Sequence, residues 1–199
     1  MHDNDCYLGL ECFLYSLLLI PGFGSACEQW QSRCRTEGVI EDVCDGNIWK
    51  EFQICGDRPF LSDPFAFGLT MTGSNDTNTL VGAIMNLPHN LRYKREIILL
   101  VGIIPGPHEP SRVINLYLDP LLQEMLHFWD GIHLDVHGYH KIFVRCALLC
   151  LACDQPAGRK AAGFLGHSAH LACSRCLKCF VGGVGEMDYS GFDRKNWPP

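Results

Sequence analysis

The sequence predicts an α/β fold, and two features carry that prediction. Four apolar runs of strand length are separated by turn residues, and a stretch between the third and fourth runs repeats its apolar residues at helical spacing. The composition suits a packed domain, since 47% of the 199 residues are hydrophobic and 19% are charged. A chain of this length has room for one domain with its own core and a small appendage.

Residues 1–60 are predicted to form a helical and turn-rich N-terminal segment. Residues 7–35 divide into two helices at "PGFGS", and residues 36–65 are rich in turn residues. The apolar run Phe13–Ile20 also resembles the core of a signal peptide, but the "MHDNDC" before it carries two Asp and no cation. The run is too short to cross a bilayer as a helix. We therefore expect a buried helix here, in a nuclear or cytoplasmic protein that is neither secreted nor bound to a membrane.

Residues 61–160 contain the predicted sheet. Its first three strand signals are "FAFGLTM", "TLVGAIMNL" and "REIILLVGIIPG". Asp119 and Pro120 then suit the N-cap and the first position of a helix that Gly131 ends. Residues 132–144 alternate between polar and apolar, which fits a hairpin or a strand and a loop, and residues 145–153 read as another buried strand.

The order strand, strand, strand, helix, strand is that of the first half of a ribonuclease-H-like fold. We predict a partial ribonuclease-H-like fold: a mixed sheet with flanking helices, a helical N-terminal extension and a Cys/His-rich insertion after the fourth strand. Asp154 directly follows that strand, where a carboxylate could bind Mg²⁺ for phosphodiester chemistry. The alternative is that Asp154 only caps the next helix, which Pro156 would suit.

Residues 161–199 contain a Cys/His cluster. Cys173 and Cys176 form a CxxC pair, His167 and His170 precede it, and Cys179 follows it. The three cysteines with one of the histidines would make a Cys₃His set, which is typical of structural Zn²⁺. A reduced CxxC pair packed against the core and a redox dithiol are the alternatives.

Twelve cysteines are many, but their distribution does not suggest a disulfide scaffold. None lies between Cys55 and Cys146, and three lie in the apolar run 145–153, where a free Cys behaves as a small hydrophobe. We therefore expect a reducing, intracellular compartment.

Five segments carry a family resemblance: "DVCDGNIWKEF", "PFLSDPFAFGLTM", "GAIMNLPHNLRYKREIILLVGIIPGPHEPSRVINLYLDPLLQEMLHFWDGI", "CALLCLACDQPAGRKAAGFLGHSAHLACSRCLKCF" and "DYSGFDRKNWPP". In this order they resemble the transposase domain of CACTA (En/Spm-like) cut-and-paste elements of the type found in invertebrate and fungal genomes. The resemblance implies a ribonuclease-H-like core whose three acids bind Mg²⁺ or Mn²⁺, with transposon-end DNA as the partner. It makes Asp154 the second acid and matches His167, Cys173 and Cys176 to a feature that follows this acid in the family.

Two departures from the family pattern bear on activity. The first acid of the family falls near Ser74, and Asp76 is the nearest acid, although it is out of register. The chain ends at "NWPP", before the strand and helix that carry the third acid in the family, and neither Asp188 nor Asp193 replaces it. We therefore expect a transposase fragment that is inactive alone, with an open sheet edge that favours self-association.

A second hypothesis is a non-catalytic, zinc-stabilised module that binds DNA or a protein. The basic segments "RYKR", "GRK" and "DRK" would form its contact surface, although a net charge of −6 argues against a protein that coats nucleic acid through its overall charge. A third hypothesis, a secreted cysteine-rich protein, requires cleavage of the N-terminal run and formation of disulfides.

Overall fold

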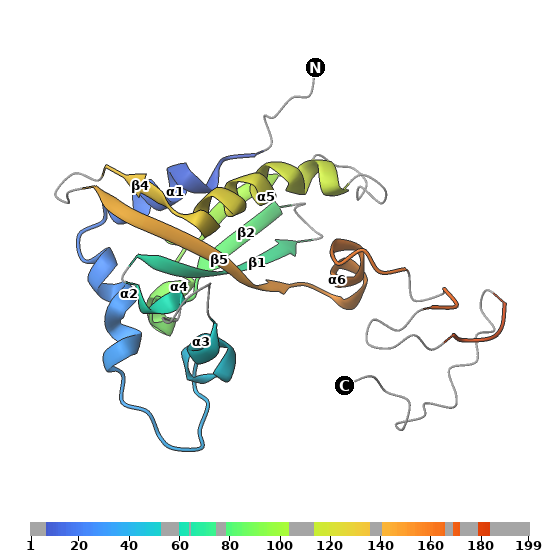
Figure 1. Ribbon diagram of the computed structural model, residues 1–199, viewed down its shortest axis with the longest axis horizontal. Coiled ribbons are helices and arrows are strands. Elements are labelled where there is room, and N and C mark those ends of the chain that lie inside the picture. The colour runs from blue at the N-terminus through green and yellow to red at the C-terminus, as the bar shows by residue number, and fades with distance from the viewer. Residues whose placement is uncertain are drawn as a thin grey trace. The chain divides into compact units, whose positions relative to one another are not determined.

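The computed structural model describes residues 7–52, 60–63, 65–74, 79–103, 114–135, 141–165, 169–171 and 179–183. The chain divides into two compact units, residues 1–152 and residues 153–199. The first unit is a five-stranded mixed sheet with helices, which agrees with the α/β prediction (Figure 1).

The strands lie in the order β3-β2-β1-β5-β4. Their bounds are β1 Ala66–Ser74, β2 Thr79–Ile84, β3 Leu99–Ile103, β4 Ile132–Leu134 and β5 Ile142–Ala152. β1 pairs with β2 and β2 with β3 in antiparallel fashion, whereas β1 and β5 are parallel. β4 and β5 form an antiparallel pair, which is the hairpin alternative for residues 132–144. The parallel pair needs a crossover connection, and the helix between β3 and β5 provides it.

The first unit contains five α-helices among its described residues. They are α1 Leu10–Leu18, α2 Phe23–Ser32, α3 Asn47–Glu51, α4 His89–Arg92 and α5 Ile114–Asp130, joined by 3₁₀ turns at Val43–Asp45 and Phe60–Ser62. The break at "PGFGS" is confirmed, because α1 and α2 meet there at 85°. Across the described part of the chain, no single helix is long and apolar enough to span a membrane, and only the bent α1–α2 pair reaches that length and hydropathy together.

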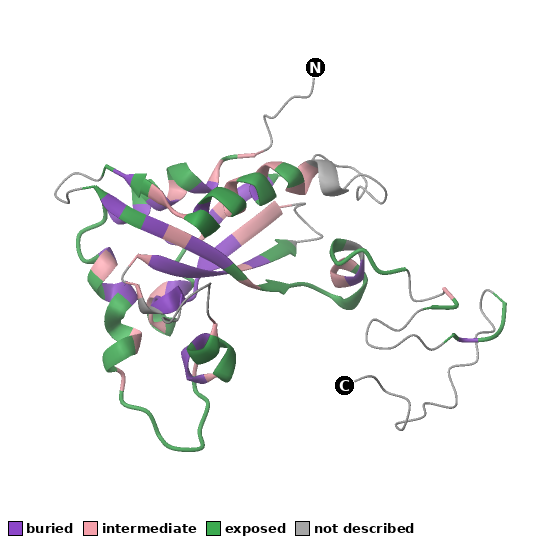
Figure 2. Ribbon diagram, viewed as in Figure 1, coloured by how far each residue is buried: buried purple, intermediate pink, exposed green. Residues whose placement is uncertain are grey.

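The buried hydrophobic residues form two clusters, and the alternation of side chains along β1 sets them on opposite faces of the sheet. Figure 2 shows the buried residues along the strands. Phe67, Leu69 and Met71 alternate along β1 and belong to the larger cluster, which α1, α2 and α5 help to build. Ala66 belongs to the smaller cluster on the other face, with Trp49 of α3. The N-terminal helices therefore cover the sheet rather than standing apart from it.

Helix α5 begins earlier than the sequence predicted. It starts at Ile114, so Asp119 is not its N-cap and Pro120 lies inside the helix. A proline there has no N–H to donate to the carbonyl of residue 116, which is one lost bond in a helix of 17 residues. The predicted end at Gly131 is confirmed, since its N–H donates to His127 at 2.9 Å and its φ is +99°.

Strand β5 is only partly buried, which corrects the prediction of a wholly buried strand. Val144 and Cys146 are fully buried, but Leu148 is 41% exposed and Cys150 is also exposed. β4 pairs only with the first three residues of β5. The outer edge of β5 therefore has no strand partner beyond Val144 among the described residues.

Candidate functional site

Asp154, the proposed second acid, lies two residues beyond the end of β5 and caps helix α6 (Gln155–Ala161). Its Oδ1 accepts the N–H of Ala157 at 2.8 Å, and its carbonyl accepts the N–H of Gly158 at 2.9 Å. This is the N-cap geometry, in which the side chain binds the third amide of the helix. The residue is exposed, so capping through Oδ1 leaves Oδ2 accessible to another ligand.

The "DQPAGRKAAGF" segment is a short helix capped at both ends. Gly163 has φ +73°, and the N–H of Phe164 donates to the carbonyl of Arg159 at 2.8 Å, which is the Schellman arrangement. Arg159 is 8% exposed, and its Nε donates to the carbonyl of Leu165 at 2.8 Å. Its guanidinium therefore braces the turn after α6 and does not belong to the basic surface expected from "GRK".

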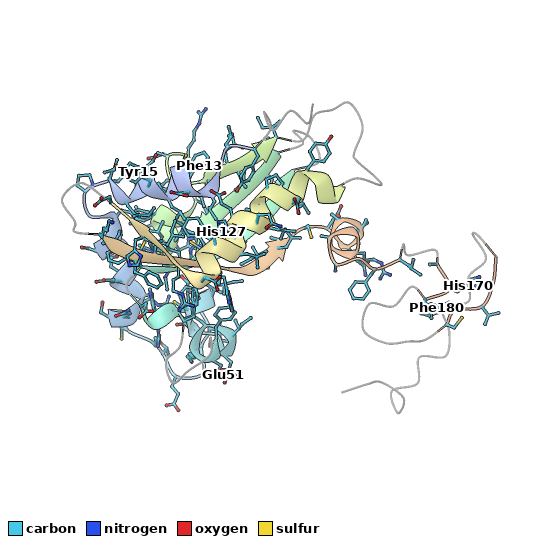
Figure 3. All side chains as sticks on the ribbon, turned by 45° about the horizontal axis from the view of Figure 1, so that its top comes forward. Phe13, Tyr15, Glu51, His127, His170 and Phe180 are labelled. Carbon is cyan, nitrogen blue, oxygen red and sulfur yellow. The ribbon has the colours of Figure 1, made fainter. Side chains whose placement is uncertain are left out.

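His170 is held against Phe180 by two hydrogen bonds in the second unit (Figure 3). Its Nδ1 lies 2.7 Å from the carbonyl oxygen of Phe180, and the N–H of Phe180 donates to the carbonyl of His170 at 2.7 Å. A carbonyl oxygen only accepts, so Nδ1 carries the proton and the neutral ring has its lone pair on Nε2. Zinc-binding histidines commonly donate one ring N–H to a carbonyl in this way.

Four of the predicted site residues lie outside the described part of the chain: Asp76, His167, Cys173 and Cys176. Within the described ranges, no three His, Cys, Asp or Glu side chains gather as a metal site. Cys179 is described, exposed and free, and follows His170 by nine positions. The predicted zinc set is thus represented in the structure by His170 and Cys179 alone.

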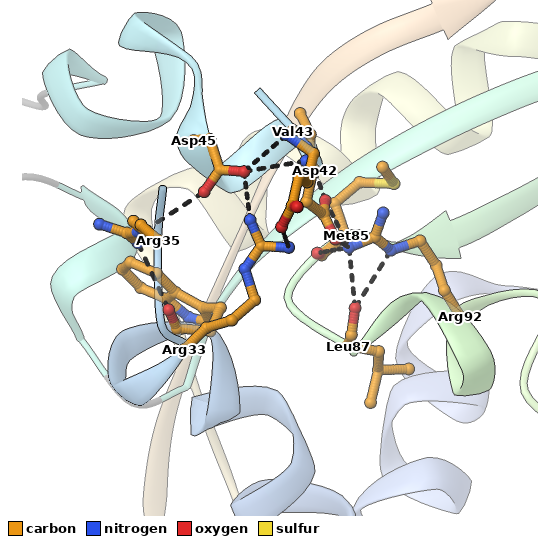
Figure 4. A network of polar contacts seen from close by, with 10 residues as sticks. Arg33, Arg35, Asp42, Val43, Asp45, Met85, Leu87 and Arg92 are labelled. Carbon is orange, nitrogen blue, oxygen red and sulfur yellow. Dashed lines mark hydrogen bonds and ion pairs between the residues drawn. The ribbon is translucent and has the colours of Figure 1, made fainter. Parts of the chain in front are cut away.

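A buried polar network joins the turn at residues 42–45 to the end of β2, and sequence reasoning missed it (Figure 4). Nη2 of Arg92 donates to Oδ1 of Asp42 at 2.9 Å and to the carbonyls of Met85 and Leu87 at 2.9 and 2.8 Å. The side chains of Arg92 and Asp42 are 4% and 7% exposed. Arg92 is therefore structural, which corrects the view of "RYKR" as wholly a surface segment, whereas Lys94 and Arg95 are exposed.

Asp45 is the second acid of the network. Hydrogen bonding to Arg33 lowers the pKa of Asp45 to about 2, and the backbone N–H groups of Asp42 and Glu41 add to this shift. Nε of Arg35 lies 3.3 Å from Oδ1 of Asp45. Asp42 and Asp45 form a reciprocal capping box, so the D-x-x-D spacing was a sequence signal that could have located this turn.

The network lies at the end of the sheet opposite the carboxyl ends of β1 and β5. Met85 follows β2, and β2 is antiparallel to β1, so the residues after β2 lie where β1 begins. Catalytic groups in open α/β sheets gather at the carboxyl ends of strands. We therefore assign the network a structural role, and the carboxyl ends of β1 and β5 are the edge at which a catalytic site is expected.

These features, a mixed sheet with a parallel β1–β5 pair and an acid that caps the helix after β5, define a protein of the α/β class. A family model described as transposase family tnp2 matches residues 37–182, which is more than half of the chain. The chain belongs to this transposase family and is a transposase-related protein, and the family implies DNA as a partner in general terms. No curated protein and no solved structure matches the chain.

Proposed function

We propose that the chain is a DNA-binding transposase domain of the CACTA type with a partial ribonuclease-H-like sheet. The family match over residues 37–182 carries the proposal. The topology supports the sheet assignment: β1, β2 and β3 form an antiparallel meander, α5 crosses over, and β5 pairs parallel with β1. In that assignment Asp154 is the second metal-binding acid and Asp76 the candidate for the first. The protein would act inside the cell, on DNA at transposon ends.

Asp154 is a suitable type of ligand for Mg²⁺ or Mn²⁺, but a single carboxylate is too few to hold a pair of these ions. It is an exposed carboxylate, and hard cations prefer oxygen ligands. A pair of metal ions needs several carboxylates to hold both. We therefore propose that the chain alone binds one ion weakly through Asp154 and does not cleave DNA.

Two substitutions at Asp154 separate metal binding from helix capping. Asn is as good an N-cap as Asp, so Asp154→Asn keeps the cap of α6 and removes the charge, whereas Asp154→Ala removes both. We expect both variants to lose Mn²⁺ binding, measured by water-proton relaxation enhancement. Only Asp154→Ala should speed amide hydrogen exchange in α6. Asp135→Asn, at another exposed acid, is the control and should change neither measurement.

Unchanged Mn²⁺ binding in both Asp154 variants would contradict the metal assignment and leave Asp154 as a cap only. The expected inactivity has its own test, cleavage of supercoiled DNA with Mn²⁺. Cleavage by the full chain that disappears in Asp154→Asn would contradict inactivity while supporting the metal role.

The second candidate function is a zinc-stabilised, non-catalytic module that binds DNA or a protein. The observation that favours it is the hydrogen bond between Nδ1 of His170 and the carbonyl of Phe180. This bond places the proton of the neutral ring on Nδ1 and leaves the lone pair of Nε2 available to a metal ion. We propose His170, Cys173, Cys176 and Cys179 as the ligands. Zn²⁺ would be structural, holding the segment that follows α6.

Native mass spectrometry of protein purified under reducing conditions tests the zinc proposal. One equivalent of Zn²⁺ is expected, lost in Cys173→Ser and His170→Ala but retained in His167→Ala and in the control Cys34→Ser. Zinc that follows His167 instead would contradict the choice of histidine. DNA binding that weakens steeply with salt would support DNA as the partner of either candidate, because phosphate contacts release counterions.

A further inference from the structure

Helix α5 is apolar on two faces, and only one of them is buried. Leu121 and Phe128 are 4% and 1% exposed in the larger cluster. On the outward side, Leu122 is 50% exposed, Leu126 59% and Trp129 37%, and Figure 2 shows exposed residues along this helix. These three residues are spaced i, i+4, i+7 and so lie along one side of the helix, where the ring of Trp129 also packs against Phe52 and Phe60. We call them the α5 outer stripe. Exposed apolar residues in such a contiguous row commonly mark a binding surface.

The ends of the α5 outer stripe are acidic. Asp119 and Asp130 are both exposed, and the helix contains no Lys or Arg between Ile114 and Asp130. Glu124 does not add to this surface, because it binds the start of α1. Asp130 is the last residue of α5, where the helix macrodipole disfavours an acid. Arg145 offsets part of this cost, since its Nε and Nη2 donate to the carbonyl of Trp129 at 3.1 and 3.0 Å, and a cationic partner would add to that effect.

We propose that the α5 outer stripe is the docking surface for an amphipathic helix of another protein, with an apolar face bordered by basic residues. Apolar anchors at i, i+4 and i+7 are the spacing by which one helix packs against another. Lys or Arg at both ends of the partner would meet Asp119 and Asp130. The two acids disfavour nucleic acid and anionic lipid as occupants of this surface by charge.

A second copy of the chain is a poor occupant for the same reason. An antiparallel pair of α5 helices places Asp119 of one copy near Asp130 of the other, and a parallel pair places each acid near its own counterpart. Either arrangement sets like charges against each other at both ends of the apolar contact.

Titration of the full chain with two synthetic helical peptides tests the proposal. The probe is a Leu/Lys amphipathic peptide of about 18 residues, long enough to cover the stripe at 1.5 Å per residue. Its control has Glu at every Lys position. We expect the Lys peptide to bind, its affinity to fall as salt rises, and the Glu peptide to bind at least tenfold more weakly.

Variants of the chain locate the surface. The double variant Leu122→Gln/Leu126→Gln should weaken binding of the Lys peptide at least tenfold. Trp129 is left unsubstituted, because its ring stacks on Phe60. Leu19→Gln with Ile20→Gln is the matched control, since these residues are 44% and 40% exposed in the turn after α1. This control should bind as the wild type does.

Three outcomes would overturn the proposal. One is equal affinity of the Lys peptide for the wild type and the Leu122/Leu126 variant. Another is equal affinity of the Lys and Glu peptides. The last is self-association in sedimentation velocity that the Leu122/Leu126 variant abolishes, which would make a second copy the occupant.

Discussion

The side chain of Asn86 forms hydrogen bonds with the backbone of β1 just beyond the point where β2 ends. β2 ends at Ile84, and two residues later Oδ1 of Asn86 accepts the N–H of Gly68 at 2.8 Å, while its Nδ2 donates to the carbonyl of Ala66 at 3.0 Å. The side chain thus satisfies a donor and an acceptor of β1 as a paired strand would. Asn86 is 2% exposed, so water cannot take over these bonds.

Asn86→Ala should therefore lower the free energy of unfolding by about 2–4 kcal/mol, because it leaves two buried backbone groups without partners. Urea denaturation of the full chain measures the change. Asn90→Ala, at an exposed position of α4, is the control and should stay within about 0.5 kcal/mol of the wild type. Equal losses in the two variants would refute this role of Asn86.

The element whose stability is least apparent from its own sequence is α1. Its N-cap is Gly9, which has no side chain to bind the first amides. Glu124 of α5 supplies the acceptors instead: Oε2 accepts the N–H of Leu10 at 2.6 Å and Oε1 that of Glu11 at 2.9 Å. Oε2 also accepts the Tyr7 hydroxyl, and burial, with Glu124 beside it, raises the pKa of Tyr7 above its usual range. Two helices far apart in the chain are joined in this way.

Glu124→Gln should destabilise α1, because the amide group has one acceptor where the carboxylate had two and no negative charge for the helix N-terminus. We expect a loss of about 1–2 kcal/mol, with faster hydrogen exchange at the first amides of α1. Glu11→Gln is the matched control, since that exposed acid lies in the first turn without forming the cap. A larger effect at Glu11 than at Glu124 would contradict the remote cap.

At this scale the sequence predicted the elements better than the contacts between them. Apolar runs located β1, β2, β3 and β5, because each of these strands is a nearly continuous run of apolar residues bounded by turn residues, although β5 is only partly buried. The start of α5 was wrong, since the Asp119-Pro120 pair has the local chemistry of a helix start but lies within the helix. Glu124 carried no local signal for its role, because its partners are more than a hundred positions away. The zinc cluster and Asp76 stay predictions.

At the scale of the whole first unit, two arginine–aspartate pairs hold the segment after α2: Arg92–Asp42 attaches it to the end of β2, and Arg33–Asp45 attaches it to the end of α2. Arg92 binds Asp42 and the turn after β2, and Arg33 binds Asp45. Hydrogen bonding to Arg33 holds the pKa of Asp45 at about 2, below the value near 4 expected in the unfolded chain. A pKa lowered by folding stabilises the protein above the unfolded value, and this contribution is lost as the pH falls through the folded value.

Asp45→Asn should therefore destabilise the protein at neutral pH, and its difference from the wild type should shrink between about pH 4 and pH 2. Urea denaturation at a series of pH values measures both effects. Glu37→Gln, at an exposed acid of the same loop, is the control, and its difference from the wild type should stay small throughout. If the difference in free energy of unfolding between Asp45→Asn and the wild type does not depend on pH, the ion pair does not contribute to the acid sensitivity of the protein.

The parallel pairing of β1 with β5 has a consequence for the order in which the chain folds. β1, β2 and β3 are neighbours in sequence, so their pairing closes only short loops. Ala66 of β1 pairs with Arg145 of β5, which is far along the chain and is synthesised later. Local pairings form first, and non-local ones set the rate. During synthesis the free edge of β1 is thus open until β5 leaves the ribosome, and this interval is when neighbouring nascent chains could pair with it.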